Sequence, residues 1–259
     1  MSRFDKLEIP DRNQESGMKK DDSGQKIIYD AGQFMELADR GFWQGNYDNA
    51  LRYYAKALAE NPGLEKAWLG QVLCLVRLNE IKEALIWVDN ALSKFPRDSD
   101  ILAARALVSG RLNQKAQAMD FSDAAISENT NSFFPWIVRG DVLLQVKSAN
   151  ADRCFQKATE IQRNDWRVMT FIGDSCFENA CYRKALIYYQ KAVEIDPENA
   201  RTWLQLGRCR RNLGFSGADD AFDHCRELRP NWKQAEAIIH ESIPFRRKLK
   251  RIIGKFKKN

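Results

Sequence analysis

The sequence predicts an all-α protein built as a solenoid of repeated helix pairs, and three observations lead to that prediction. Apolar residues recur three or four positions apart, the spacing of one helix face, as at Phe34, Leu37 and Ala38. The pattern returns after 34 residues, for example from Pro62 to Pro96. A proline ends each regular copy, because proline cannot continue the hydrogen-bond ladder of a helix.

Six copies can be aligned over residues 31–231, each predicted to join two helices through a short turn. Their predicted bounds are 31–64, 65–98, 99–132, 133–165, 166–199 and 200–231. The third copy carries Thr130 where the proline is expected, and the fourth and sixth copies are one residue short. Because each helix pair leaves an apolar face open, neighbouring copies are expected to stack on one another.

Two segments flank the predicted array. Residues 1–30 are polar, with mixed charges, and are predicted to be disordered or loosely attached. Residues 232–259 are predicted to form a capping helix followed by a basic amphipathic tail. Apolar residues make up 44% of the chain and charged residues 29%, a composition typical of a folded soluble protein.

The positive charge of the chain is concentrated in its last residues. The formal net charge is +6, yet one stretch near the C-terminus holds eight basic residues and no acidic one. These are Arg246, Arg247, Lys248, Lys250, Arg251, Lys255, Lys257 and Lys258. Without them the remaining chain carries a net charge of −2, so the high isoelectric point belongs to the tail and not to the array.

The tail, residues 245–258, segregates its residues by type. On a helical wheel of about 100° per residue, one arc holds the apolar residues Phe245, Leu249, Ile252, Ile253 and Phe256, and every basic residue lies outside it. Three interpretations stay open: the tail caps the array, lies on an anionic membrane surface, or binds an acidic partner or nucleic acid. Nucleic acid is the weakest of these, because the array supplies no second basic surface.

No pattern of catalytic or metal-binding residues is found in the chain. It has two histidines, no C-x-x-C pair among its six cysteines, and no phosphate-binding glycine motif. We therefore expect no enzyme, no cofactor and no metal. The thiols are expected to be small buried groups in a reducing cytoplasm, and the first residues lack the apolar stretch of a secretory signal.

Two segments carry a family pattern. Residues 47–62 and 182–197 both read Tyr-x-x-Ala-Leu-x-Tyr-Tyr-x-Lys-Ala-x-x-x-x-Pro, and by this pattern the array resembles the tetratricopeptide repeat (TPR) family. The resemblance implies a right-handed superhelix whose concave groove is lined by the first helix of each repeat. It also implies a scaffold or adaptor that binds a peptide or helix of a partner protein.

The groove positions that the resemblance implies form a graded surface, apolar in the first repeats and basic in the sixth. The candidate binding residues are Met35, Asp39, Trp43, Leu69, Leu73, Arg77, Ile137, Asp141, Asp174, Phe177, Arg201, Arg208 and Arg211. The three arginines of the sixth repeat are predicted to bind a carboxylate or phosphate, because the guanidinium fork pairs with both. The alternative is that the apolar residues pack between helices and the arginines form a solvated face.

One subgroup of the family grips acidic chaperone tails with a clamp of Lys, Asn, Asn, Lys and Arg. This chain carries Met35, Asp39, Gly70, Leu73 and Ala103 at or near those positions, so it departs from the clamp. The sequence thus predicts an adaptor for another protein segment. The alternative function is a membrane-peripheral assembly factor that the tail tethers to anionic lipid. Neither the partner nor the oligomeric state follows from the sequence.

Overall fold

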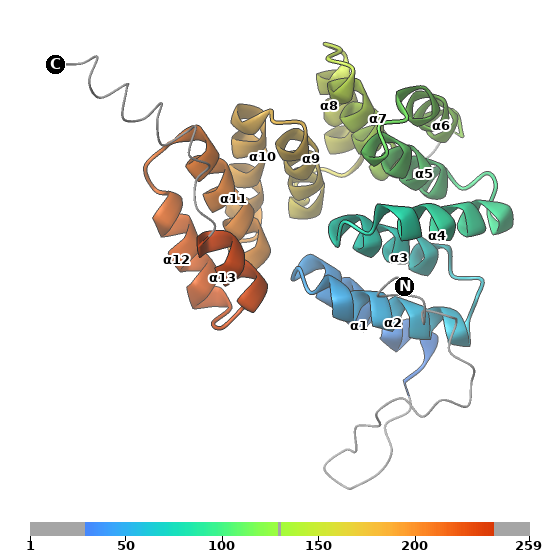
Figure 1. Ribbon diagram of the computed structural model, residues 1–259, viewed down its shortest axis with the longest axis horizontal. Helices are drawn as coiled ribbons and strands as arrows, with labels where there is room; N and C mark the ends of the chain where they lie inside the picture. Colours follow the sequence, from blue (N-terminus) through green and yellow to red (C-terminus); the bar gives the residue numbers. More distant parts are fainter. Residues whose placement is uncertain (1–28, 129–130, 241–259) are drawn as a thin grey trace, which may run out of the picture.

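The computed structural model describes residues 29–128 and 131–240, and within them every regular element is a helix (Figure 1). The first helices of six successive pairs are α1 (Ala31–Trp43), α3 (Glu65–Arg77), α5 (Ser99–Arg111), α7 (Phe134–Gln145), α9 (Trp166–Glu178) and α11 (Ala200–Leu213). The second helices are α2 (Tyr47–Glu60), α4 (Ile81–Lys94), α6 (Lys115–Ser127), α8 (Ala151–Ile161), α10 (Tyr182–Ile195) and α12 (Ala218–Leu228). A last helix, α13 (Lys233–His240), follows them, and the predicted all-α repeat superhelix is confirmed.

Each turn inside a helix pair has a residue in the left-handed region after the first helix, and the last turn contains Gly217 as a second one. The residues that follow the first helices are Gly45, Asn79, Asn113, Lys147, Ala180 and Gly214, with φ between 57° and 76°. Such a residue ends the first helix and lets the chain reverse into the second. Successive turn residues lie 34 positions apart, except that Ala180 follows Lys147 after 33, where the fourth copy is one residue short.

Glycine allows close packing of the two helices in three of the repeats. The pairs are Gly140 with Phe155, Gly173 with Tyr189, and Gly207 with Phe222. A Cβ atom on Gly140 would lie 2.3 Å from the ring of Phe155. Phe155 is fully buried, so its ring has no space into which it could move.

Replacing Gly140 with Ala is therefore expected to lower the free energy of unfolding by about 1–3 kcal/mol, the usual cost of overpacking a core. Urea unfolding would measure the loss. Gly41→Ala in helix α1 is a matched control, because its Cβ would come no closer than 3.4 Å to the atoms of Ala50. Alanine also favours a helix, so this variant should be neutral or slightly stabilising. Equal midpoints for the two variants would contradict the prediction.

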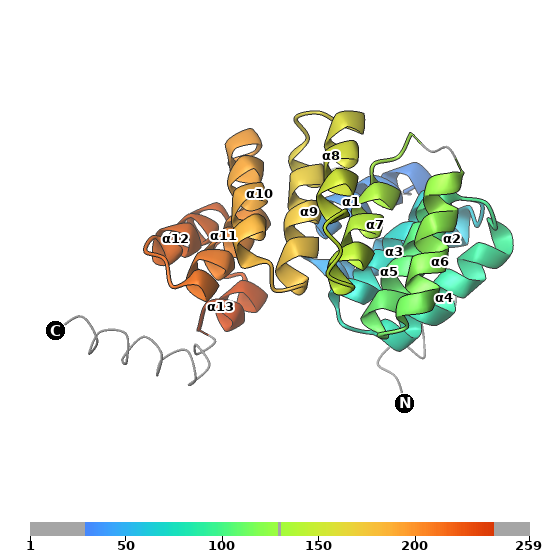
Figure 2. The same cartoon turned by 90° about the horizontal axis from the view of Figure 1, so that it is seen from above.

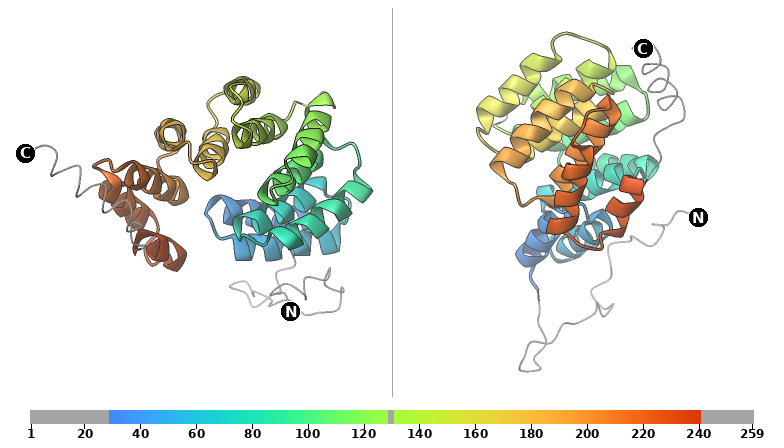
Figure 3. Two further views of the ribbon diagram at one scale, coloured as in Figure 1. Left: turned by 45° about the horizontal axis from the view of Figure 1, so that its top comes forward. Right: turned by 90° about the vertical axis from the view of Figure 1, so that its left-hand side faces the viewer.

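The array curves so far that its last pair meets its first (Figures 1 and 3). Arg201 Nε of α11 donates to the hydroxyl of Tyr47 at 2.6 Å, across 154 positions of sequence. A Cβ atom on Gly45, in the turn between α1 and α2, would lie 2.7 Å from the ring of Trp232. We call this contact between the Gly45 turn and the sixth repeat the ring closure.

Helix α9 lies between the two ends of the array. In the view from above it separates α10–α13 from the larger group α1–α8 (Figure 2). It packs closely on α10 and shares only sparse contacts with α8. Its concave side contacts the first repeat, where Phe171 lies 5.1 Å from Trp43 between ring centroids. The position of α9 therefore determines how much of the concave surface stays open.

The predicted capping helix corresponds to α13. Trp232, just before this helix, and Ala235 within it are buried against a small core that includes Leu204 and Phe222 of the sixth repeat. The apolar side of α13 thus covers the face that the sixth repeat would otherwise leave open.

The flanking segments lie largely outside the described residues. At the N-terminus Asp30, assigned to the loose segment, caps α1: its carboxylate accepts from Gln33 N at 2.7 Å, and Gln33 accepts in return from Asp30 N. The rest of that prediction, for residues 1–28, and the tail predictions for residues 245–258 fall in parts that the structure leaves undescribed. Among the helices described, none has the length and apolar character needed to cross a bilayer.

Candidate functional site

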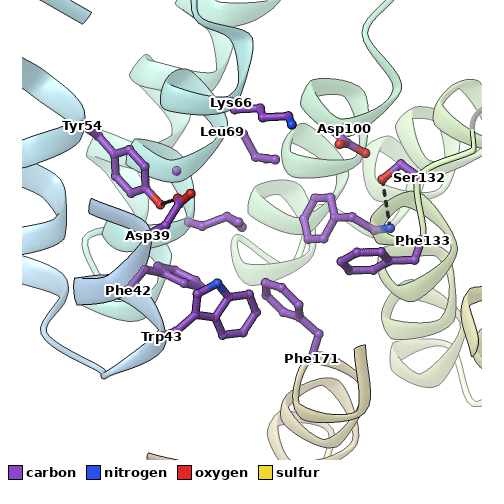
Figure 4. Close-up of a pocket in the computed structure, with 13 residues that line it drawn as sticks. Asp39, Phe42, Trp43, Tyr54, Lys66, Leu69, Asp100, Ser132, Phe133 and Phe171 are labelled. Atoms are coloured by element: carbon purple, nitrogen blue, oxygen red, sulfur yellow. Dashed lines mark hydrogen bonds between the residues drawn. The ribbon is translucent and has the colours of Figure 1, made fainter. Parts of the chain in front are cut away.

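A cavity of about 270 Å³ opens on the concave face, and residues of the first five repeats line it (Figure 4). We call it the concave cavity. Its lining residues are Asp39, Phe42, Trp43, Tyr54, Lys66, Leu69, Gly70, Leu73, Asp100, Ser132, Phe133, Phe134 and Phe171. Most of them come from α1, α3, α5, α7 and α9, which are first helices of their repeats.

Aromatic rings form one wall of the concave cavity. Phe171 of α9 is the centre of this wall, with ring centroids 5.1 Å from Trp43, 5.7 Å from Phe134 and 6.4 Å from Phe133. Phe42 completes the group at 5.2 Å from Trp43. Residues that are distant in sequence make this wall, because the ring closure brings α9 against α1. Such a wall offers a large apolar contact area of fixed geometry.

Charged groups also line the concave cavity: in Figure 4 Asp39 lies beside Phe42, Lys66 lies at the top and Asp100 lies near Ser132. Asp39 accepts a hydrogen bond of 2.6 Å from the Tyr54 hydroxyl. Burial and the Asp39 carboxylate raise the pKa of Tyr54, so the hydroxyl remains a donor. Gly70 allows this arrangement, because a Cβ there would lie 2.3 Å from the Tyr54 ring.

Asp100 occupies a less polar position than Asp39. Burial raises its pKa, while a hydrogen bond with Ser132 and the charge of Lys66 act in the opposite direction. Its Oδ1 atom is buried and has no hydrogen-bond partner. The lining therefore contains two carboxylates and one ammonium group, which suits a ligand that combines apolar and cationic groups.

A second zone of the concave face is closed by a buried ionic network centred on Asp174. This carboxylate accepts from Arg77 of α3 and Arg201 of α11, both at 2.6 Å, and from the Tyr189 hydroxyl at 2.8 Å. Burial alone would raise the pKa of Asp174, but the two guanidinium groups hold it below its ordinary value. The network ties α3 and α11 to α9, and the cavity beside it is small, about 30 Å³.

A similar arrangement occurs one repeat earlier. Asp141 is fully buried and accepts from Arg111 at 3.3 Å, from Gln145 at 2.8 Å and from Asn179 at 3.0 Å. Burial tends to lower the pKa of Arg111, but Asp141 and nearby carboxylates raise it overall. Asp141 and Asp174 thus hold neighbouring repeats together, and their side chains are already paired.

Apart from the arginines of the sixth repeat, the candidate residues from the sequence fall into three groups in the structure. Asp39, Trp43, Leu69 and Leu73 meet in the concave cavity. Arg77, Ile137, Asp141 and Asp174 belong to the closed zone, where the last three are buried. Met35 and Phe177 are partly buried and pack against the main core. About half of the candidate binding residues are therefore packed within the array, which was the alternative interpretation of the sequence.

The basic end of the groove needs a correction. Arg201 is 3% exposed and pairs with Asp174 and Tyr47, so it is no free anchor for a ligand. Arg211 donates to the carbonyl oxygens of Ile238 and Ile239, both at 2.8 Å, and so caps α13. The remaining arginine, Arg208, stacks on Phe177 at 4.7 Å and bonds to Gln205. The three arginines therefore serve separate structural contacts, and the contact of Arg201 with Tyr47 exists because the array bends back on itself.

Several lining residues were missed by sequence reasoning. Phe171 lies on α9, but outside the positions that the family pattern assigns to ligand contact. Phe133 precedes α7, in a segment that the repeat alignment treats as a connection. Two adjacent aromatic residues before Pro135 were the one available signal, since exposed connections seldom carry such a pair.

Comparison with known families decides the class of this array. Models described as tetratricopeptide repeat match residues 43–108, 167–199 and 188–216. These ranges contain the two segments with the strongest repeat pattern. The chain is a TPR protein. Its repeat fold is that of protein-interaction scaffolds, a class of proteins that is typically not catalytic.

Two curated proteins resemble this TPR protein over most of its length. Pre-mRNA-splicing factor 6 of Saccharomyces cerevisiae is 24% identical over 215 residues, which cover 80% of this chain and 24% of the relative. Anaphase-promoting complex subunit 3 of Schizosaccharomyces pombe is 24% identical over 168 residues, which cover 64% and 25%. The chain thus spans about a quarter of the length of these relatives.

Among solved structures, a thermophilic TPR protein of Thermus thermophilus is similar in fold. It is 18% identical with a TM-score of 0.55, and the alignment covers 71% of this chain and all of that one. At this identity the likeness concerns the fold alone.

Proposed function

We propose that this TPR protein is an adaptor that holds a segment of a partner protein in the concave cavity. The observation that supports the proposal is the cavity itself, an opening of about 270 Å³ with an aromatic wall and charged lining groups. Aromatic anchors next to polar groups are typical of the centres of protein interfaces. A volume of this size suits one or two bulky side chains of a bound segment.

The proposal divides the chain by role. Residues 31–231 form the array that holds the site, residues 232–259 cap it and supply the tail, and residues 1–30 precede it.

The six cysteines are free and all but Cys181 are buried, which favours a reducing compartment such as the cytoplasm. We propose binding rather than catalysis, because the charged groups of the cavity surround an apolar surface. No finding favours the membrane-tethered alternative.

Replacing Leu69 with Glu should weaken ligand binding. Leu69 is partly exposed in the concave cavity, so a carboxylate there would meet apolar partner atoms without a hydrogen-bond partner. The measurement is a selection of random peptides on the full-length protein, followed by titration of the selected peptides. We expect affinity to fall by about tenfold or more, which corresponds to about 1.4 kcal/mol.

The matched control is Ile86→Glu, which places the same charge on the 60%-exposed Ile86 of the second helix α4. This variant should keep the affinity of the parent protein. Selected peptides that bind equally well to Leu69→Glu would refute the concave cavity as the binding site. A selection that enriches no peptide would refute peptide binding altogether.

A further inference from the structure

The basic tail, residues 245–258, has no role in the function proposed above. It combines five apolar residues with eight basic ones and contains no acidic residue. We infer that this tail is a ligand of the concave cavity in its own chain, where it competes with the partner segment. The inference rests on the proposed function, because both assign binding to the same cavity.

The place where the described chain ends supports this inference. Trp232, just before α13, lies against Gly45, and Trp43, the last residue of α1, lines the concave cavity. The other end of α13 is held by Arg211, which bonds to the carbonyl oxygens of Ile238 and Ile239. The chain therefore leaves the array from a defined point on the sixth repeat, at the end of α11 that lies away from the ring closure.

The length of the remaining chain is sufficient. From Arg201, at the ring closure, to Arg211, at the end of α13, the axial distance along α11 is about 15 Å, at 1.5 Å per helical residue. Residues 241–259 follow His240, and nineteen residues can span up to about 60 Å when extended. The tail can thus pass back along α11 and place its apolar residues in the concave cavity.

The chemistry of the two surfaces is complementary. The aromatic wall around Phe171 matches the apolar residues of the tail, among which Phe245 and Phe256 are aromatic. Asp39 and Asp100 give the lining two negative charges against the single positive charge of Lys66. Arg77 and Arg167 already lie over the rings of Phe171 and Trp43, so the basic residues of the tail gain mainly from the two carboxylates.

Attachment to the same chain makes even a weak contact effective. A short flexible connection gives a tethered ligand an effective concentration in the millimolar range. A partner segment must then displace the tail, which lowers its apparent affinity. Only a partner segment with enough affinity to displace the tail would then occupy the concave cavity.

Photo-crosslinking in the full-length protein tests the inference. The photoreactive residue p-benzoylphenylalanine replaces Phe245 or Phe256 in separate variants, and mass spectrometry maps the adducts. We expect intramolecular adducts from one of these positions to residues that line the concave cavity. The double variant Asp39→Asn with Asp100→Asn should lower the adduct yield about fivefold, because it removes two negative charges that attract the basic residues of the tail. Asp120→Asn with Glu194→Gln, exposed carboxyls on α6 and α10, is the matched control and should not change the yield.

A second measurement separates the inference from the proposed function. A full-length variant with Phe245, Leu249, Ile252, Ile253 and Phe256 all replaced by Ser should bind the selected peptides about tenfold more tightly than the parent. Absence of adducts in the cavity, or adducts only between isotopically distinct chains, would overturn the intramolecular assignment. If peptides bind but no adducts form, the tail inference alone fails. If adducts form but no peptide binds, the tail inference stands and the proposal that the cavity binds a partner segment fails.

Discussion

Replacing Asp174 with Asn is expected to lower the free energy of unfolding by about 3–5 kcal/mol, the usual cost of breaking a buried ion pair by removing one partner. The Asp174 carboxylate is 3% exposed and receives Arg201 and Arg77 at 2.6 Å each. Asparagine keeps the shape but removes the charge. Arg201, itself 3% exposed, would remain buried without a counter-ion. Chemical unfolding at neutral pH measures the loss.

The same variant has a predictable pH dependence. Because the pKa of Asp174 is lower in the folded protein than in the unfolded chain, its stabilisation is fully present above the unfolded pKa, near 4. It is lost as the pH falls through the lower folded pKa. The difference in unfolding free energy between the parent protein and Asp174→Asn should therefore be largest at neutral pH and shrink below about pH 4.

The control for this prediction is Asp152→Asn. Asp152 is 59% exposed and pairs with Lys184 at 2.6 Å on the surface. Pairs of this kind contribute up to about 1 kcal/mol, because water and salt screen them. A loss for Asp174→Asn no greater than that for Asp152→Asn would show that the network around Asp174 does not hold the repeats together.

Replacing Gly45 with Ala is expected to open the ring closure and to lower the free energy of unfolding by about 2–4 kcal/mol. Gly45 has a φ of +76°, which costs an alanine about 1 kcal/mol. The added Cβ would also lie 2.7 Å from the ring of Trp232, which is packed in the small core of the sixth repeat. That clash adds the cost of overpacking, about 1–3 kcal/mol.

Gly214→Ala is the matched control for Gly45→Ala. Its φ is +71°, almost the same as that of Gly45, but a Cβ there would meet nothing within 4 Å. The free energy of unfolding of this variant should fall only by the cost of the left-handed backbone, about 1 kcal/mol. Small-angle X-ray scattering should show a larger radius of gyration for Gly45→Ala only. Equal stability and equal radius for the two variants would mean that the first and last repeats are not held together in solution.

The helix pairs of this TPR protein could be predicted from the sequence because their causes are local. Apolar spacing, turn residues such as Gly45 and Asn79, and prolines such as Pro62 each act within one repeat. The missing residue of the fourth copy was also visible, and it appears as the shorter step from Lys147 to Ala180. Stacking of the pairs follows because each leaves an apolar face open.

The candidate site could be predicted only in part. Asp39, Trp43 and Leu69 lie on the concave side, because they occupy facing positions of the first helices. Whether such a residue stays accessible depends on what lies opposite, and this is set by residues more than a hundred positions away. Arg201 shows the consequence: its helix position suggested an exposed anchor, whereas Asp174 and Tyr47 bury it.

By itself, then, the sequence of this TPR protein determined the repeat, its helix pairs and the separation of a nearly neutral array from a basic tail. Only the tertiary structure decided where the concave face is open and where it is closed. The physical reason is curvature: small rotations between successive repeats add up along the array. Their sum brings the sixth repeat onto the first and places Phe171 against Trp43, a contact that no local pattern encodes.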